Sequence, residues 1–241
     1  MLKLLKKYLF RDILNRMNDL ETALYVLVNS PAYNHRENVG FNGQKGKKRI
    51  FADLLDTFNF SCLIETGTFV GDTAGYMANT ARLPVFSSEL NPHFYSLAKL
   101  RLKGLPSISL YNLDSRAFMR RLGEKPEITR KECFVYLDAH WGRDCPLKEE
   151  IAVIASCWDK FIVMIDDFQV PGDDGYGYDR FGTFIKLNLA YIRPVLKRFD
   201  LCTFFPRLPA EEESGAPNGC VIISKNGAFA HALNQIRSLR H

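Results

Sequence analysis

The chain has 241 residues and a formal net charge of +5, and 46% of its residues are hydrophobic and 24% charged. This composition excludes an intrinsically disordered chain and is typical of one globular domain with a short extension. Residues 1–49 carry ten basic and four acidic side chains, whereas the remaining residues carry 22 and 23. Because the main part of the chain is close to neutral, we expect no nucleic-acid partner.

The sequence also limits the compartment in which the protein works. No stretch approaches the roughly 18 apolar residues that a transmembrane helix needs. Lysines interrupt the first seven residues, which therefore lack the apolar core of a signal peptide. The six cysteines include no C-x-x-C pair, which favours reduced thiols over disulfides or a zinc site. We expect a cytoplasmic protein without a transmembrane segment.

An amphipathic helix is predicted near the N-terminus, where apolar residues recur at steps of three and four: Leu2, Leu5, Leu9, Ile13, Met17, Leu20, Leu24 and Leu27. Such a helix could dock on its own domain, pair with a second copy in a homo-oligomer, or lie on a membrane surface. Acidic residues interrupt its basic face, so we favour docking or self-association. Residues 30–49 are predicted to form a loop, either a linker or a cover over a cofactor. We therefore divide the chain into residues 1–49, an N-terminal helix and loop, and a main domain of residues 50–241.

Strands and helices alternate along the main domain. Strands are expected at residues 60–64, 84–90, 107–113, 133–137, 161–165, 200–205 and 219–224. Helices are expected at residues 50–58, 73–81, 94–102, 146–156 and 184–191. This alternation indicates an α/β fold with a mostly parallel sheet and helices on both faces. In such sheets, ligands bind beyond the carboxyl ends of the strands.

The first strand runs into a turn that contains two glycines, Glu65-Thr-Gly-Thr-Phe-Val-Gly71. Its glycines can adopt positive φ and bring the backbone close to a ligand, and the helix that follows offers free N–H groups. An ordinary strand-to-helix corner is the alternative. The negative charge of Glu65 disfavours a pyrophosphate group at this turn. The G-x-G-x-x-G pattern of folds that bind nicotinamide dinucleotides is also missing. We predict a site for S-adenosylmethionine (SAM), contacted by Glu65, Thr66, Gly67, Thr68, Phe69, Gly71 and Thr73.

Acidic residues follow the next strands as well. Glu89 ends the second strand, where a carboxylate can accept hydrogen bonds from both ribose hydroxyls. Asp114 and Ser115 follow the third strand and are suited to the adenine amino group. Glu89 or Asp114 alone could instead be a helix N-cap. Asp138, after the fourth strand, completes the predicted cofactor site.

Three aspartates follow the fourth and fifth strands: Asp138, Asp166 and Asp167. If these strands are neighbours, the three carboxylates converge and raise one another's pKa unless a cation neutralises them. Mg²⁺ is the first choice for an all-oxygen site, followed by Mn²⁺ or Ca²⁺. The alternative is that one aspartate caps a helix while the others face solvent.

Residues 60–224 resemble the class I SAM-dependent methyltransferases. The resemblance lies in Glu65-x-Gly67, the Glu89-Leu-Asn-Pro92 turn, Leu137-Asp138 and the Asp166-Asp167 pair. These motifs are similar to those of the divalent-metal-dependent O-methyltransferases of the catechol and macrocin (sugar) types. The resemblance implies a Rossmann-like sandwich of seven strands, the last antiparallel. It also implies that Asp138, Asp166 and Asp167 hold the cation, which binds two adjacent hydroxyls of the acceptor.

His140 stands two residues beyond Asp138, near the position of the base in the sugar enzymes. Catechol enzymes carry a lysine after their first acid, and its absence here disfavours catechol acceptors. Because an unperturbed histidine has a pKa near ~6.5, His140 is the predicted catalytic base. A packed histidine bonded to a backbone carbonyl is the alternative.

Aromatic residues and glycines follow the predicted metal ligands. We expect Trp141, Phe168, Tyr176 and Tyr178 to wall the acceptor pocket. The three glycines at positions 172, 175 and 177 would let their loop act as a lid, although an irregular surface loop is the alternative.

These features predict an enzyme that transfers a methyl group from SAM to a hydroxyl group. The expected acceptor is a vicinal diol of a small molecule or of a sugar-containing metabolite, with Mg²⁺ as the second cofactor. The alternative is a non-catalytic SAM-binding subunit that assembles with a partner through its N-terminal helix.

Overall fold

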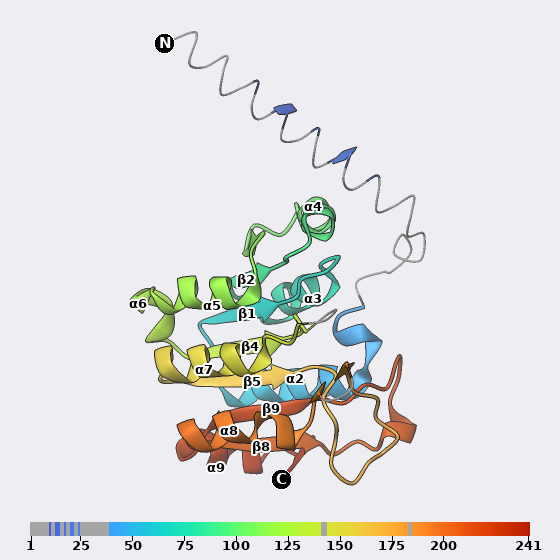
Figure 1. Cartoon of the computed structure of the whole chain (residues 1–241), viewed down its shortest axis with the longest axis vertical. Helices are drawn as coiled ribbons and strands as arrows, with labels where there is room; N and C mark the ends of the chain where they lie inside the picture. Colours follow the sequence, from blue (N-terminus) through green and yellow to red (C-terminus); the bar gives the residue numbers. More distant parts are fainter. Residues whose placement is uncertain are drawn as a thin grey trace.

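A large sheet lies at the centre of the structure, a computed structural model of the chain (Figure 1). The structure describes residues 39–140, 144–182 and 185–241, and seven residues of the N-terminal segment: Phe10, Ile13, Leu14, Met17, Leu20, Glu21 and Leu24. Within these residues, eight strands form the sheet in the order β10-β8-β9-β5-β4-β1-β2-β3. Their bounds are β1 (Cys62–Thr66), β2 (Val85–Ser88), β3 (Ile108–Tyr111), β4 (Cys133–Leu137), β5 (Phe161–Ile165), β8 (Leu201–Pro206), β9 (Val221–Lys225) and β10 (Leu239–Arg240).

The strands β3, β2, β1, β4 and β5 pair in parallel. β9 is antiparallel to both of its neighbours, β5 and β8, and β10 adds an antiparallel edge beside β8. The predicted Rossmann-like sheet, with an antiparallel strand at the end of the series, is therefore confirmed, and β10 is an additional short strand. A separate hairpin pairs β6 (Arg180–Phe181) with β7 (Ile185–Lys186).

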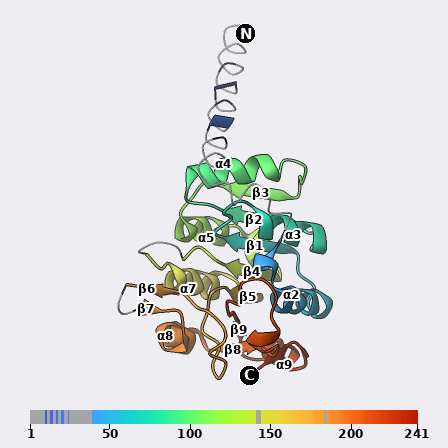
Figure 2. The same ribbon diagram turned by 90° about the vertical axis from the view of Figure 1, so that its right-hand side faces the viewer.

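Helices cover both faces of the sheet (Figure 2). One face carries α5 (Ser115–Gly123), α7 (Leu147–Cys157) and α8 (Leu189–Phe199), and the other carries α2 (Lys45–Thr57), α3 (Asp72–Ala81) and α9 (Ala228–Asn234). Between residues 39 and 241, the other helical elements that the structure describes are α4 (Pro92–Arg101), the short α6 (Pro126–Thr129), η2 (Phe41–Gly43) and η3 (Ala210–Glu212).

A large hydrophobic core packs on each face of the sheet, because successive residues of a strand point to opposite faces. In β1, Ile64 belongs to the core of α5 and α7. Its neighbour Leu63 belongs to the core of α2 and α3. All five residues of β1, β4 and β5 are buried, as expected for parallel strands covered on both faces. The strand ends that precede the predicted site are therefore rigidly held.

Several helices differ from the sequence prediction. α2 begins at Lys45 rather than at residue 50, and Phe41 before it is fully buried. The packed part of the chain therefore begins before residue 50, where the sequence analysis divides the chain. The helix expected at residues 184–191 is misplaced, because β7 lies there and Asn188 caps α8 by accepting a hydrogen bond from the N–H of Tyr191 at 3.0 Å. The sequence did not predict α5, α6 or α9.

The acidic loop before β9 anchors the start of α2. The carboxylate of Glu213 accepts hydrogen bonds from the N–H of Gly46 at 2.9 and 3.1 Å. The hydroxyl of Ser214 accepts another from the N–H of Lys45 at 2.9 Å. A carboxylate at a helix N-terminus is favoured by the helix dipole. These bonds fix the turn of α2 that carries Lys47.

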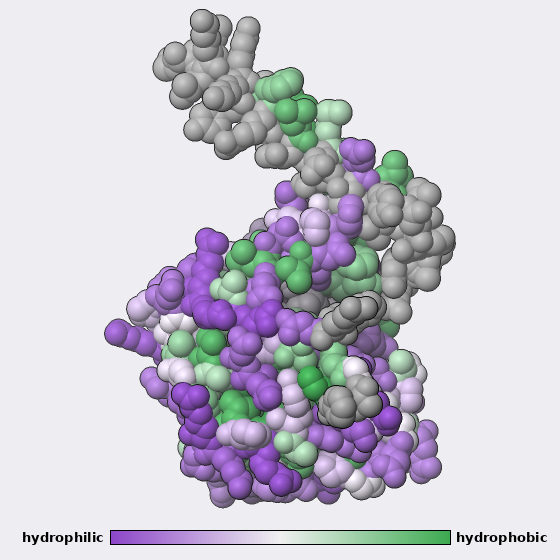
Figure 3. All heavy atoms as spheres, viewed as in Figure 1, coloured by the Kyte–Doolittle hydropathy of each residue, from purple (hydrophilic) through white to green (hydrophobic). Residues whose placement is uncertain are grey.

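The described residues of the N-terminal segment are helical, and the apolar ones are exposed: Phe10, Ile13, Leu14, Met17, Leu20 and Leu24. Figure 3 shows apolar side chains of this segment on the surface. The rest of the predicted helix, residues 30–38 of the predicted loop, and Trp141 lie outside the described residues, so self-association stays a prediction. Among the described helices, none is long and apolar enough to cross a lipid bilayer.

Candidate cofactor and metal site

A cavity of about 750 Å³ lies beyond the carboxyl ends of the parallel strands. This volume is within the usual range for small-molecule sites. Residues that follow five different strands line it: Gly67, Glu89, Asp114, Asp138 and Asp167. The cavity therefore lies at the edge of the sheet where the sequence predicts a ligand.

The turn after β1 approaches the end of β4 so closely that only glycine fits at position 67. Gly67 has a φ of 83°, and a Cβ atom there would lie 2.2 Å from the carbonyl oxygen of Asp138. Beyond it, Phe69 also has a positive φ, 50°, and its ring centroid lies 4.5 Å from that of Phe94. Both aromatic residues line the cavity. The turn thus brings backbone and an aromatic pair to the ligand space.

Glu65 lies beneath the turn rather than in the cavity. Its side chain is 1% exposed, and its carboxylate accepts a hydrogen bond from the hydroxyl of Ser87. That hydroxyl shares a second hydrogen bond with Thr68, at 2.5 Å. Burial raises the pKa of Glu65 to about 8, although the bond from Ser87 opposes the shift. Glu65 and Thr68 therefore support the turn from inside the protein.

The other predicted cofactor residues of this turn also lie outside the cavity lining. Gly71 is the N-cap of α3 with a φ of 90°. The hydroxyl of Thr73 accepts a hydrogen bond from the N–H of Phe41 at 3.1 Å and so holds η2. Thr66 is fully buried. The predicted cofactor residues that do line the cavity are Gly67, Phe69, Glu89, Asp114, Ser115 and Asp138.

Glu89 presents a carboxylate that two backbone donors hold in place. The N–H of Phe69 donates to Oε2 at 2.7 Å, and the N–H of Asn91 donates to Oε1 at 2.8 Å. Burial raises the pKa of Glu89, and these two backbone hydrogen bonds oppose the shift. Each oxygen retains acceptor capacity toward the cavity, which suits a pair of adjacent hydroxyl groups.

Asp114 is both a helix cap and a cavity residue. Its carboxylate accepts a hydrogen bond from the N–H of Arg116 at 2.9 Å, and the Arg116 guanidinium lies 2.9 Å from its other oxygen. These bonds with Arg116 lower the pKa of Asp114. The N-cap role weighed for Asp114 is therefore real, while Ser115 and Arg116 line the cavity beside it.

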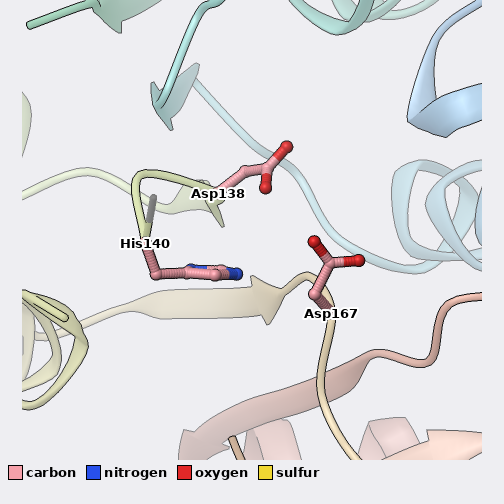
Figure 4. A group of neighbouring side chains, drawn as sticks. All are labelled: Asp138, His140 and Asp167. Atoms are coloured by element: carbon pink, nitrogen blue, oxygen red, sulfur yellow. The ribbon is translucent and has the colours of Figure 1, made fainter. Parts of the chain in front are cut away.

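Asp138, His140 and Asp167 turn toward one common space (Figure 4). Each of the three residues offers one potential ligand atom, and these three atoms lie within 4.8 Å of one another. Asp167 has a φ of 48°, a strained conformation of the kind that clusters at functional sites. His140 is fully buried, and neither ring nitrogen has a hydrogen-bond partner of normal geometry among the described residues.

Asp166 is not a member of this group. Its carboxylate accepts a hydrogen bond from the ammonium group of Lys47 and another from the hydroxyl of Tyr136. The N–H of Asp167 donates a third, at 2.8 Å. Both Lys47 and Asp166 are excluded from solvent. The predicted ligand set of Asp138, Asp166 and Asp167 is thus not assembled as expected, because Lys47 and Tyr136 engage Asp166 while His140 lies beside the other two aspartates.

Burial governs the charges of this region. It raises the pKa of Asp138 and brings that of Asp167 to about 7, and the charge of Asp166 adds to both shifts. It lowers the pKa of His140 to about 4, although the charge of Asp166 opposes this. Burial alone would lower the pKa of Lys47, but its attraction to Asp166 raises it overall. The group therefore combines carboxylates with a neutral imidazole, which a bound cation would stabilise.

Of the residues predicted to wall the acceptor pocket, the three that the structure describes do not line this cavity. Phe168 and Tyr176 are buried in the core of α7 and α8, and the hydroxyl of Tyr176 donates to the carbonyl of Leu208 at 2.9 Å. Tyr178 instead contacts Arg180. Asn42 and Asn218 line the cavity, from η2 and from the loop before β9. No local sequence pattern marks these two residues, since only the fold brings their distant segments together.

Comparison with known proteins bears on the fold. No protein-family model matches the sequence, and no curated protein sequence matches it either. Several solved structures are similar to this chain. One of them, a Klebsiella pneumoniae protein assigned as an O-methyltransferase, has 14% sequence identity and a TM-score of 0.53. The match covers 88% of this chain and 90% of that protein. The methyltransferase domain of bacterial CtHen1-C is 13% identical, with a TM-score of 0.51 over 76% and 98%. The O-methyltransferase TomG from Streptomyces achromogenes, solved with SAM, is 16% identical with a TM-score of 0.50 over 76% and 80%.

At such low identity, these likenesses establish the fold. Together with the strand order, they show that this chain has the Rossmann-like α/β fold of these methyltransferase structures, with a cavity beyond the strand ends. The resemblance expected from the sequence is therefore confirmed at the level of the fold.

Proposed function

We propose that this chain transfers the methyl group of SAM to a hydroxyl group of a small acceptor, with the help of a divalent cation. The observation that carries the proposal is that one cavity is lined both by the Gly67 turn with Glu89 and by Asp138 with Asp167. The first pair suits SAM, and the second suits an acceptor bound through a cation.

In this proposal, Glu89 binds the ribose of SAM. Its two oxygens are pre-oriented by backbone donors, so little ordering is needed when the hydroxyls bind. Phe69, Ser115 and the backbone at Gly67 complete the cofactor side of the cavity. Glu65, Thr68 and Gly71 act on SAM only indirectly, by fixing the turn.

The residues present fit a divalent cation. Carboxylates that face one space, beside a buried imidazole whose nitrogens lack partners of normal geometry, form a donor set that a cation would satisfy. A bound cation would lower the pKa of the acceptor hydroxyl. Asp138 and Asp167 line the cavity, so one of their carboxylate oxygens accepts the proton that the hydroxyl loses. The hydroxyl oxygen then bonds to the methyl carbon as the carbon–sulfur bond breaks, and S-adenosylhomocysteine leaves.

The acceptor proposed here is a vicinal diol of a small molecule or of a sugar-containing metabolite. Asn42 and Asn218 line the cavity, and carboxamides both donate to and accept from hydroxyl groups. Their presence, without Phe168, Tyr176 or Tyr178 in the wall, favours a polar acceptor over a flat aromatic one.

Two measurements test this function. Calorimetry should detect binding of SAM and S-adenosylhomocysteine in the micromolar range. Transfer of radiolabelled methyl from SAM to a panel of vicinal diols should occur with added divalent metal and stop in EDTA. Full transfer in EDTA would contradict the cation, and SAM binding without transfer to any acceptor would favour the non-catalytic subunit.

A further inference from the structure

The position of His140 separates two roles that the sequence alone leaves open. A catalytic base must come within hydrogen-bond reach of the hydroxyl that it deprotonates. His140 is fully buried and is not among the residues that line the cavity, although Asp138 and Asp167 are. The imidazole is therefore less accessible from the cavity than the two carboxylates, which disfavours a role as the base.

The same position suits a metal ligand. Its nitrogen lies within 4.8 Å of carboxylate oxygens of both Asp138 and Asp167, and Figure 4 shows the ring directed toward the space between them. Neither ring nitrogen makes a hydrogen bond of normal geometry among the described residues, and the only backbone group that interacts with the ring there is that of Asp166, which can engage one nitrogen at most. Leaving a buried polar atom unpaired is costly, so a ligand for at least one nitrogen is expected.

Asp166 cannot easily serve as the third ligand. One of its oxygens accepts from Lys47 and from the N–H of Asp167, and the other accepts from Tyr136. A cation at Asp166 could reach only the oxygen that also accepts from Tyr136, and it would lie close to the buried ammonium group of Lys47, which repels it.

From these observations we infer that His140 is a metal ligand together with Asp138 and Asp167, and that this site prefers a divalent transition metal to Mg²⁺. Imidazole nitrogen suits first-row transition metals, whereas Mg²⁺ prefers oxygen donors alone. The inference deepens the proposed function, on which it rests for the presence of a cation. It replaces both the predicted role of His140 as a base and the expectation of Mg²⁺.

The direct test is pulsed EPR of the full-length protein loaded with Mn²⁺ in a buffer without nitrogen ligands. Coupling between Mn²⁺ and a histidine nitrogen should appear in the wild type and disappear in His140→Ala. Uniform ¹⁵N labelling should change the coupling pattern, which shows that the nitrogen belongs to the protein. His231→Ala, which removes an exposed histidine of α9, is the matched control and should keep the coupling. Bound Mn²⁺ without any nitrogen coupling would overturn the inference.

Metal affinities supply a second readout. Calorimetry should give Co²⁺ at least a tenfold tighter affinity than Mg²⁺ for the wild type, following the order of transition-metal stabilities. His140→Ala should weaken the binding of Co²⁺ at least tenfold and that of Mg²⁺ by less than about threefold, because only the transition metal is bound more tightly by an imidazole nitrogen. Equal losses for the two metals would contradict the inference. Binding of S-adenosylhomocysteine establishes that the variant is folded.

The outcomes for the metal and for SAM are separable. If SAM binds but neither Mn²⁺ nor Co²⁺ does, the metal inference fails while SAM-dependent methyl transfer stands. If nitrogen-coupled Mn²⁺ is found but SAM does not bind, the ligand assignment holds and the proposed function fails.

Discussion

The ammonium group of Lys47 donates a hydrogen bond to the carboxylate of Asp166 inside the protein, where neither side chain is reached by solvent. Lys47 comes from a run of basic residues before the first strand, a pattern that usually marks a solvated surface. Here the third residue of α2 turns inward, because Glu213 and Ser214 fix the start of that helix. The pair neutralises one of the three carboxylates at the ends of β4 and β5.

Replacing Lys47 should destabilise the fold strongly. Lys47→Met leaves the Asp166 carboxylate buried without its cation, and we expect a loss of about 3 to 5 kcal/mol in the free energy of unfolding. The double variant Lys47→Met/Asp166→Asn should recover part of this loss, because no charge is then buried unpaired. Urea denaturation measures both. A double variant less stable than Lys47→Met would show that the ion pair is not the source of the effect.

Glu89 should control the affinity for SAM. Glu89→Gln keeps the size of the side chain, but its amide nitrogen cannot accept hydrogen bonds from the backbone N–H groups or from ribose hydroxyls. We expect S-adenosylhomocysteine to bind about tenfold more weakly or worse, which corresponds to about 1.4 kcal/mol. Calorimetry provides the measurement, and Glu127→Gln on the exposed side of α6 is the control. Unchanged affinity in Glu89→Gln would mean that the ribose is bound elsewhere.

Gly67 should tolerate no side chain. Gly67→Ala places a methyl group 2.2 Å from the carbonyl oxygen of Asp138 and holds alanine at a φ of 83°. We expect the turn to shift, with loss of S-adenosylhomocysteine binding and a lower melting temperature. Gly104→Ala is the matched control, because a Cβ there meets nothing within 4 Å. Its stability should be unchanged or slightly higher. Normal ligand binding in Gly67→Ala would refute the requirement for glycine.

Glu150 on α7 should make stability depend on pH. Its side chain is fully buried, and neither oxygen has a hydrogen-bond partner of normal geometry among the described residues. Burial raises its pKa from 4.5 to about 7, although the nearby hydroxyls of Ser115 and Thr66 oppose the shift. The folded state therefore retains the proton that the unfolded state loses. This contribution to stability is fully present below pH 4.5 and is lost as the pH rises through 7.

Glu150→Gln should remove that dependence. Relative to the wild type, the variant should gain on the order of 1 to 3 kcal/mol in stability between pH 4.5 and pH 8. Urea denaturation at several pH values measures the difference. A constant difference across this range would show that Glu150 has the same pKa in the folded and the unfolded protein.

The sequence by itself determined the fold and the edge of the sheet at which the site lies. The alternation of apolar strands and helices, and the acids at residues 65, 89, 114, 138, 166 and 167 after successive strands, are local patterns. Parallel strands place their carboxyl ends at one edge, so these acids had to gather there. The tight turn at Gly67 was also readable, because positive φ is a property of the residue itself.

Only the tertiary structure decided which of these acids face the cavity. Glu65 lies under the turn and Asp166 is paired with Lys47, although both stand at the end of an apolar strand, as the acids that line the cavity do. Lys47 and Asp166 are 119 residues apart, and their pairing depends on how α2 docks on the sheet. The same holds for His140, whose role depends on which way its ring turns at the end of β4. Such contacts arise from the packing of distant segments, and no local spacing in the sequence encodes them.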